Sequence, residues 1–525
     1  MDMSIITRAV LQPARMQAAD KPALSCEDTT WTYRDLAAKV HTYANGLLEI
    51  GVQRGDRVGI LLLNSLEYWA LYLAASRIGA IAVRLNWRLT TEELAYVISD
   101  SGTTVLCTHD RFLPAIPPHG EGRPLQTVVV FPYDESSGAS EADVLWQSDF
   151  EASDSDEPDA ALPSLEDPCM LMYTSGTTGK PKGALWTHGN SLWFATMQAM
   201  RWHYDETTVA MSTGPLFHVG SFEDHLLPAL VCGGHAVITP SGGFSYERAI
   251  ETVGARQVTD SLFYPFMIYD MLADKDVSTF NLDSMRRVTT GGAPLLPWAV
   301  RRFNEAFPHV SLEQVYGLTE GGAISTVMPP EHLDRHPGSA GTPLPFTELR
   351  IARAGDPEVD ADSDEVGELW VRSPSVCAGY YGKPEETAET FIDGWCRTGD
   401  LARLSHDGFL YIVDRAKDMI ISGGENIYPA ELEAVLSDHP GVRDVAIVGV
   451  PDAKYQEAVC AVIVREPDAA LDADTVIAYS RQRLAGYKKP RHVVFVDDLP
   501  RNASGKVLKR TLRRSYESLG AEAHG

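Results

Sequence analysis

Apolar and polar positions alternate in blocks between residues 30 and 108. Residues 55–63 read as a turn into a buried strand, and residues 80–85 and 103–108 are further short apolar runs. Three helices are predicted around these runs, one before the first run and one in each gap between runs: residues 35–48, 65–77 and 90–99. Gly51 and Gly79 mark the ends of the first two helices. An alternation of strand and helix predicts a wound α/β sheet.

The same kind of alternation returns near the end of the chain. Residues 444–450, 458–464 and 492–495 are predicted strands, and residues 473–484 are a predicted helix. They predict a small α/β unit over residues 440–525. Residues 134–167 are polar and acidic, which predicts a solvated surface connection between elements.

Length and charge narrow the class of protein. A chain of 525 residues exceeds one hydrophobic core, so at least two domains are expected. The net charge of −27 argues against nucleic acid and anionic membranes as general partners. The seven cysteines form no Cys-x-x-Cys pair, which argues against a zinc cluster. Residues 1–20 do not resemble a signal peptide and no apolar run has membrane-spanning length, so a cytoplasmic protein is expected.

A glycine- and hydroxyl-rich stretch with two lysines follows the apolar run 169–172. It reads Tyr173-Thr174-Ser175-Gly176-Thr177-Thr178-Gly179-Lys180-Pro181-Lys182-Gly183. Glycines bring backbone N–H groups close to an anion, hydroxyls add donors, and lysines add positive charge. The Walker spacing is absent, because Pro181 follows Lys180 where a Ser or Thr is needed. A flexible turn is the alternative, but it would need no lysine pair, so we predict a phosphate-binding loop.

Two later motifs carry groups suited to a nucleotide. Residues 288–295 read as a strand that enters a glycine-rich turn, where Gly292 would let a flat ring approach the backbone. In the stretch 314–320, Tyr316 offers a stacking face and Glu320 a hard oxygen ligand for Mg²⁺. Asp400 could accept hydrogen bonds from vicinal hydroxyls such as those of ribose.

Candidate residues for binding a carboxylic acid are less specific. His218 lies in the run Pro215-Leu216-Phe217-His218, and a lone histidine among apolar residues is more often structural than catalytic. Residues 261–272 are rich in aromatic side chains, including Phe263 and Tyr264. Core packing and a pocket wall are equally good explanations of that segment.

Together these motifs closely resemble those of the adenylate-forming superfamily, which contains acyl-CoA synthetases, peptide-synthetase adenylation domains and luciferases. Its members join ATP to a carboxylic acid, release pyrophosphate, and mostly pass the acyl group to a thiol. The resemblance spans nearly the whole chain. It implies that His218 orients the carboxylate or the departing pyrophosphate, and that Thr174 and Glu320 hold Mg²⁺. The residues implied for the acid pocket are His218, Phe263, Tyr264 and Gly291. The residues implied for the nucleotide are Thr174, Ser175, Gly176, Thr177, Thr178, Gly179, Lys180, Lys182, Gly292, Ala293, Pro294, Tyr316, Gly317, Thr319, Asp400 and Arg415.

The resemblance also implies a mobile C-terminal part. Lys417 corresponds to the hinge of the family, and Lys506, in the frame Pro-Arg-Asn-x-x-Gly-Lys, enters the active site during adenylation. Gly423 and Gly424 would line the channel for the pantetheine arm of CoA, and Lys488 could meet the CoA phosphates. One departure is Gln456-Glu457, where many acyl-CoA synthetases carry Gly-Glu.

We therefore expect a large N-terminal domain of wound mixed sheets over residues 1–413, a hinge at 414–417, and a small mobile α+β lid domain over 418–525. The expected function is an ATP- and Mg²⁺-dependent ligase that converts an apolar acid to acyl-AMP and then to the CoA thioester. An adenylating enzyme that loads a carrier-protein phosphopantetheine is the alternative. Fatty, aryl and polycyclic acids all remain open. No nucleic acid or stable membrane insertion is expected, and a homodimer is left open.

Overall fold

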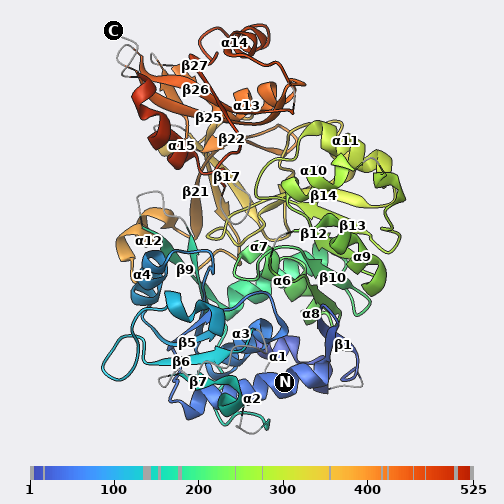
Figure 1. Ribbon diagram of the computed structural model, residues 1–525, viewed down its shortest axis with the longest axis vertical. Helices are drawn as coiled ribbons and strands as arrows, with labels where there is room; N and C mark the ends of the chain where they lie inside the picture. Colours follow the sequence, from blue (N-terminus) through green and yellow to red (C-terminus); the bar gives the residue numbers. More distant parts are fainter. Residues whose placement is uncertain are drawn as a thin grey trace.

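The computed structural model of the chain describes residues 5–15, 18–133, 144–151, 155–174, 180–242, 244–274, 276–353, 356–415, 418–422, 425–452, 455–467, 469–501 and 507–520. In these ranges the strands form four sheets with helices packed around them (Figure 1). The predicted α/β class, with a large N-terminal part and a smaller C-terminal part, is confirmed. The α-helices over the same ranges are α1 (Ile6–Val10), α2 (Tyr33–Glu49), α3 (Leu66–Ile78), α4 (Thr91–Ser101), α5 (Gln147–Phe150), α6 (His188–Trp202), α7 (Val219–Phe222), α8 (Leu226–Val231), α9 (Tyr246–Arg256), α10 (Pro265–Ala273), α11 (Pro297–Ala306), α12 (Pro384–Thr390), α13 (Pro429–Ser437), α14 (Ala473–Arg481) and α15 (Lys509–Tyr516).

The first sheet carries the strand that leads into the predicted phosphate loop. Its order is β7 (Leu145–Trp146), β6 (Thr127–Phe131), β5 (Thr103–His109), β3 (Arg57–Leu61), β4 (Ile81–Arg84), β8 (Pro168–Thr174) and β9 (Lys182–Thr187). Neighbouring strands are parallel except β8 and β9, which are antiparallel. Thr174 therefore ends β8 at the carboxyl edge of the sheet, and the chain returns at Lys182 to begin β9.

The second sheet collects most of the other predicted motifs. Its order is β16 (Thr342–Pro343), β15 (Thr326–Met328), β14 (Ser311–Tyr316), β13 (Arg287–Thr290), β12 (Asp260–Leu262), β10 (Val209–Ser212), β11 (His235–Ile238), β1 (Pro22–Cys26) and β2 (Thr29–Thr32). The central strands from β14 to β1 are parallel, and β15, β16 and β2 are antiparallel additions at the edges.

One hydrophobic core joins these two sheets. Side chains of β3 and β4 belong to the same buried cluster as those of β1, β10 and β11. Helix α3 lies in that cluster with almost every side chain buried, and Trp69 stacks on Phe222 with 3.7 Å between ring centroids. Parallel strands are usually covered on both faces, which explains why their sequences are apolar almost throughout.

The third and fourth sheets follow in sequence. The third contains β18 (Asp356–Asp360), β17 (Glu348–Arg353), β19 (Gly367–Arg372), β21 (Trp395–Leu404) and β20 (Phe391–Ile392) in that order, with β22 (Leu410–Arg415) paired to β21. The fourth contains β24 (Glu425–Ile427), β23 (Ile420–Ser422), β26 (Gln456–Arg465) and β25 (Val442–Asp452), with β27 (His492–Val496) paired to β26. Figure 1 shows the fourth sheet, in orange and red, at the end of the molecule opposite the N-terminus. Among the helices described above, none is both long enough and apolar enough to cross a membrane.

The prediction for residues 134–167 is partly wrong. Residues 134–143 and 152–154 lie outside the described residues, but Leu145–Trp146 forms β7 beside β6. Phe150 of α5 is buried against Tyr43 and Phe131. The acidic composition of this stretch predicted no regular structure, so the short strand β7 at the edge of the first sheet was missed.

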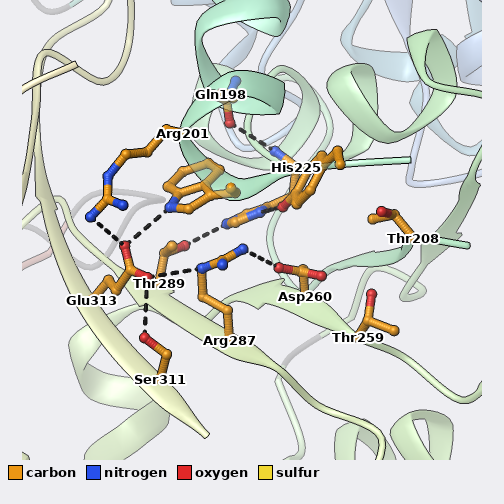
Figure 2. Close-up of polar contacts among 12 residues, drawn as sticks. Gln198, Arg201, Thr208, His225, Thr259, Asp260, Arg287, Thr289, Ser311 and Glu313 are labelled. Atoms are coloured by element: carbon orange, nitrogen blue, oxygen red, sulfur yellow. Dashed lines mark hydrogen bonds and ion pairs between the residues drawn. The ribbon is translucent and has the colours of Figure 1, made fainter. Parts of the chain in front are cut away.

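A buried polar cluster connects strands β12, β13 and β14 of the second sheet with the start of α8 (Figure 2). Arg287 of β13 donates to Glu313 of β14 at 2.9 Å and to Asp260 of β12 at 2.5 Å. His225, at the start of α8, lies 2.6 Å through Nε2 from the hydroxyl of Thr289. Because each partner comes from a different strand or helix, the cluster fixes β12, β13, β14 and the segment after His218 relative to one another.

A second buried ion pair joins the first sheet to the segment between β10 and β11 of the second. Arg84 of β4 donates to Glu223 at 2.8 Å and to the Met172 sulfur of β8 at 2.9 Å, and both charged side chains are fully buried. Replacing Glu223 with alanine leaves a buried guanidinium without its counter-charge, so we expect the free energy of unfolding to fall by about 3–5 kcal/mol. Denaturant midpoints measure this loss. The double variant Arg84→Met, Glu223→Leu should recover most of it, and an unchanged Glu223→Ala midpoint would contradict the assignment.

Candidate active site

Strand ends in the second sheet bring distant motifs together. Strands β10, β12, β13 and β14 are parallel neighbours, so their carboxyl ends share one edge. His218 follows β10, Tyr264 follows β12, Gly291 follows β13, and Gly317 follows β14. Ligands of wound α/β sheets bind at such carboxyl edges. The fold therefore gathers at one edge the motifs that the sequence spreads over residues 215–320.

The two predicted magnesium ligands are in contact. The Thr174 hydroxyl at the end of β8 donates to Glu320 Oε1 at 2.7 Å, and the Tyr380 hydroxyl donates to the same oxygen at 3.0 Å. A carboxylate and a hydroxyl are oxygen ligands that suit Mg²⁺, which commonly takes few protein ligands together with substrate phosphates. Across the ranges that the structure describes, no group of three or more His, Cys, Asp or Glu side chains could hold a metal. The residues present thus fit an ion shared with a bound polyphosphate.

The predicted phosphate loop is seen at its two ends. Ser175, Gly176, Thr177, Thr178 and Gly179 lie outside the described residues. Thr174 and Lys182 are cross-strand partners of the β8–β9 pair, which fixes both ends of the loop. The Lys182 ammonium lies 5.1 Å from the centre of the Tyr380 ring, and the Lys180 ammonium lies 4.9 Å from that of Tyr96. Both cations are therefore positioned on aromatic faces beside the loop.

Side chains that the sequence did not single out support this loop. Asp100 of α4 accepts from the Tyr173 hydroxyl at 2.9 Å and from Lys383 at 2.7 Å. The Tyr96 hydroxyl of the same helix donates to the Pro181 carbonyl at 3.2 Å. Their positions in the sequence are too far apart for any spacing rule to have found them.

The predicted nucleotide residues Tyr316, Asp400 and Arg415 form one cluster. The Tyr316 hydroxyl donates to Asp400 Oδ2 at 2.5 Å, and Arg415 Nε lies 2.5 Å from Asp400 Oδ1. Burial and the Asp400 carboxylate hold the pKa of Tyr316 well above its usual value, so its hydroxyl stays protonated. Each carboxylate oxygen keeps a further lone pair for a ligand hydroxyl. The predicted stacking of Tyr316 on adenine stays a prediction.

The glycines of the site are required by close packing. A Cβ on Gly317 would lie 1.8 Å from the Ala323 carbonyl oxygen, and one on Gly291 would lie 2.7 Å from Val315. Gly292 has a φ of +82°, which disfavours other residues. Ala293 and Pro294 follow it on the exposed side of the turn, while Thr319 lies in the turn after β14.

His218 lies beside Tyr264, another residue of the predicted acid pocket. It caps α7, with its Nδ1 accepting the Gly220 N–H at 3.1 Å. Burial, together with the charge of Arg84, lowers the pKa of His218 to about 4, so the ring is neutral at pH 7. Because Nδ1 accepts, the proton is on Nε2, which can donate to an anion. Tyr264 and Phe263 belong to a buried core cluster, and the Tyr264 hydroxyl lies 3.4 Å from His218 Nδ1.

The predicted C-terminal residues are only partly placed. Lys417, Gly423, Gly424 and Lys506 lie outside the described residues. Lys488 is described, and its ammonium bonds both carboxylate oxygens of Glu431 in α13, at 2.7 and 2.6 Å. The roles predicted for these residues stay predictions.

Comparison with known proteins agrees with this geometry. The AMP-binding enzyme family matches residues 11–381, and the AMP-binding enzyme C-terminal domain matches residues 431–506. A feruloyl-CoA synthase of Amycolatopsis sp. is 37% identical over 489 residues, covering 93% of this chain and 94% of that protein. The long-chain-fatty-acid–CoA ligase FadD13 of Mycobacterium tuberculosis is 33% identical over 517 residues, 97% of each chain. The crystal structure of ATP-bound MatB from Rhodopseudomonas palustris has a TM-score of 0.88 at 29% identity, covering 98% of this chain and 99% of that one. The chain therefore belongs to the AMP-binding enzyme family of adenylate-forming acid–thiol ligases.

Proposed function

We propose that the protein activates an apolar carboxylic acid with ATP and transfers the acyl group to coenzyme A. The observation that carries this proposal is the contact between Thr174 and Glu320, which brings the phosphate strand of the first sheet to the nucleotide edge of the second. Asp400 and Arg415 lie at the same site, since Tyr316, which donates to Asp400, ends β14 four residues before Glu320. A nucleotide could thus be held at its ribose and its phosphates together.

The chemistry follows from two anions that must meet. A carboxylate oxygen attacks the α-phosphorus of ATP, pyrophosphate leaves, and an acyl-AMP forms. Held by Thr174 and Glu320, Mg²⁺ would offset the charge of the phosphates during this step. Lys180 and Lys182 would bind the departing pyrophosphate, while the Nε2–H of His218 would orient the carboxylate. In the second step the CoA thiolate attacks the acyl carbon and AMP leaves.

An apolar acid is supported by the side chains near His218. Phe217, Phe263 and Tyr264 are buried, and the imidazole itself is neutral. The relatives named above are a feruloyl-CoA synthase and a long-chain-fatty-acid–CoA ligase, which supports CoA as the acceptor and leaves aryl and fatty acids as candidates.

We also propose that the large and small domains meet at residues 414–417. Strand β22 of the third sheet ends at Arg415, and the strands that follow build the fourth sheet. Asp414 Oδ2 accepts the Ala430 N–H at the start of α13 at 3.0 Å, so the two parts touch next to this point. Lys417 would be the hinge and Lys488, Gly423 and Gly424 would meet CoA.

An acid panel tests the proposed function. Aryl, arylalkyl, fatty and amino acids are incubated with ATP and Mg²⁺, and pyrophosphate release is scored, first alone and then with CoA or a phosphopantetheinyl carrier protein. We expect release with apolar acids only, and acyl thioester with CoA. Release that depends on no acid would refute the enzyme assignment, and thioester formed only on the carrier would refute CoA as the acceptor.

A further inference from the structure

Asp224 is a buried acid that none of the motifs above includes. It follows α7 and the Glu223 of the interior ion pair, and 5% of its surface is exposed. Its Oδ1 is buried without a hydrogen-bond partner, within the part of the chain that the structure describes. Glu223, its neighbour, is bound by Arg84, whereas no ion pair joins Asp224 to any cation among the described residues. A buried polar group left unpaired lowers stability, so such a group calls for an explanation.

The carboxyl of Asp224 lies beside two side chains of the predicted acid pocket, His218 and Tyr264. A Cβ built on Gly220 would lie 3.2 Å from the Tyr264 hydroxyl, 3.4 Å from Asp224 Oδ2 and 3.4 Å from His218 Nδ1. These three polar groups therefore meet beside Gly220, where a side chain would crowd all of them. Ser221 adds a fourth group, since its hydroxyl lies 3.2 Å from that of Tyr264.

We propose that Asp224 determines specificity by binding a hydroxyl group carried by the acid substrate. The proposal deepens the proposed function and rests on it, because His218 and Tyr264 must line the acid pocket. A hydroxyl both donates and accepts a hydrogen bond, as does a protonated carboxyl. The enzyme would then select hydroxylated acids over otherwise identical acids that leave Asp224 unpaired.

The surroundings of Asp224 favour a neutral hydroxyl over an ammonium group. Burial and the adjacent Glu223 carboxylate hold the pKa of Asp224 well above its usual range. An ammonium only donates and needs an ionised partner, which this environment disfavours. Two cations of this region interact with other groups: Arg84 pairs with Glu223, and Arg88 lies over the Trp87 ring, 4.7 Å from its centre.

The test compares acids in pairs. The preferred acid of the panel is assayed beside derivatives with one hydroxyl at each ring or chain position in turn, and beside an ammonium-bearing derivative. For the unsubstituted enzyme, we expect kcat/KM for pyrophosphate release to be about 10- to 100-fold higher with the best hydroxylated acid. Asp224→Leu should reduce this ratio to within a few-fold, and Asp224→Asn, whose amide still donates and accepts, should keep much of it.

Two controls separate specificity from structure. Asp260→Asn removes another buried acid, one bound to Arg287 in the polar cluster, and should lower stability without changing the acid ratio. Asp224→Leu should raise the thermal midpoint of the unliganded enzyme, because it removes an unpaired buried carboxyl. A purely structural Asp224 would change the midpoint and leave the ratio intact.

The outcomes are distinct. A ratio near one for the unsubstituted enzyme, or equal ratios for it and Asp224→Leu, would overturn the proposal, as would a preference for the ammonium derivative. Absence of acid-dependent pyrophosphate release with every acid would instead overturn the proposed function.

Discussion

Glu320→Gln is expected to lose about 10²- to 10³-fold in kcat/KM for acid-dependent pyrophosphate release. The amide keeps the shape of the side chain but removes its charge. Thr174 and Tyr380 both donate to Glu320 Oε1. The substitution therefore also turns the charged acceptor of these two hydrogen bonds into a neutral one. The concentration of Mg²⁺ needed for half-maximal rate should rise, because a neutral amide is a weaker ligand for a hard cation.

Glu313 supplies the matched control for this experiment. It belongs to the same strand, β14, as Tyr316, but its carboxylate is bound by Arg287 and Trp202 in the buried polar cluster (Figure 2). Glu313→Gln should lower the denaturant midpoint while retaining the Mg²⁺ dependence. If Glu320→Gln turned over at the normal rate at low Mg²⁺, the proposed magnesium site would be wrong.

Lys506→Ala is expected to reduce adenylate formation by at least about 10²-fold while sparing thioester formation from synthetic acyl-AMP. The proposed role of Lys506 is to neutralise the carboxylate and α-phosphate as they approach, which only the first half-reaction needs. The segment around it has fixed ends, because Arg501 and Val507 pair as an antiparallel bridge.

Separate assays of the two half-reactions measure this effect. Pyrophosphate release reports adenylation, and acyl-CoA yield from supplied acyl-AMP reports transfer. Lys509→Ala is the control, since it removes a nearby cation that is bound to Glu433 at 2.7 Å. It should leave adenylation within a few-fold of normal. Equal losses in both half-reactions of Lys506→Ala would refute the assigned role.

The local sequence was sufficient for the layout of the fold and for the approximate place of the site. Apolar runs predicted strands such as β3, β4 and β8, and the predicted phosphate loop begins where β8 ends. The requirement for glycine at position 291 appears once β13 and β14 are adjacent, and that at position 317 appears once the chain after β14 turns back to Ala323.

Contacts between distant segments could not be predicted in this way. Tyr380 binds Glu320 across 60 positions, and Lys383 binds Asp100 across 283. Asp224 was overlooked for a related reason: nothing in its neighbourhood along the chain reveals that its carboxyl is buried without a partner. Burial and pairing are properties of the folded chain, and no spacing rule reports them.

Asp400 and Arg415 are register partners on β21 and β22, and Arg415 is the last residue of β22. A swing of the C-terminal part about Lys417, the proposed hinge residue, would begin two residues after Arg415, so both residues proposed to bind the ribose would stay with the large domain. The acyl-adenylate would then stay bound to the large domain while the small domain turns to present a different surface to it. An intermediate that water can destroy need not be released and recaptured between the two reactions.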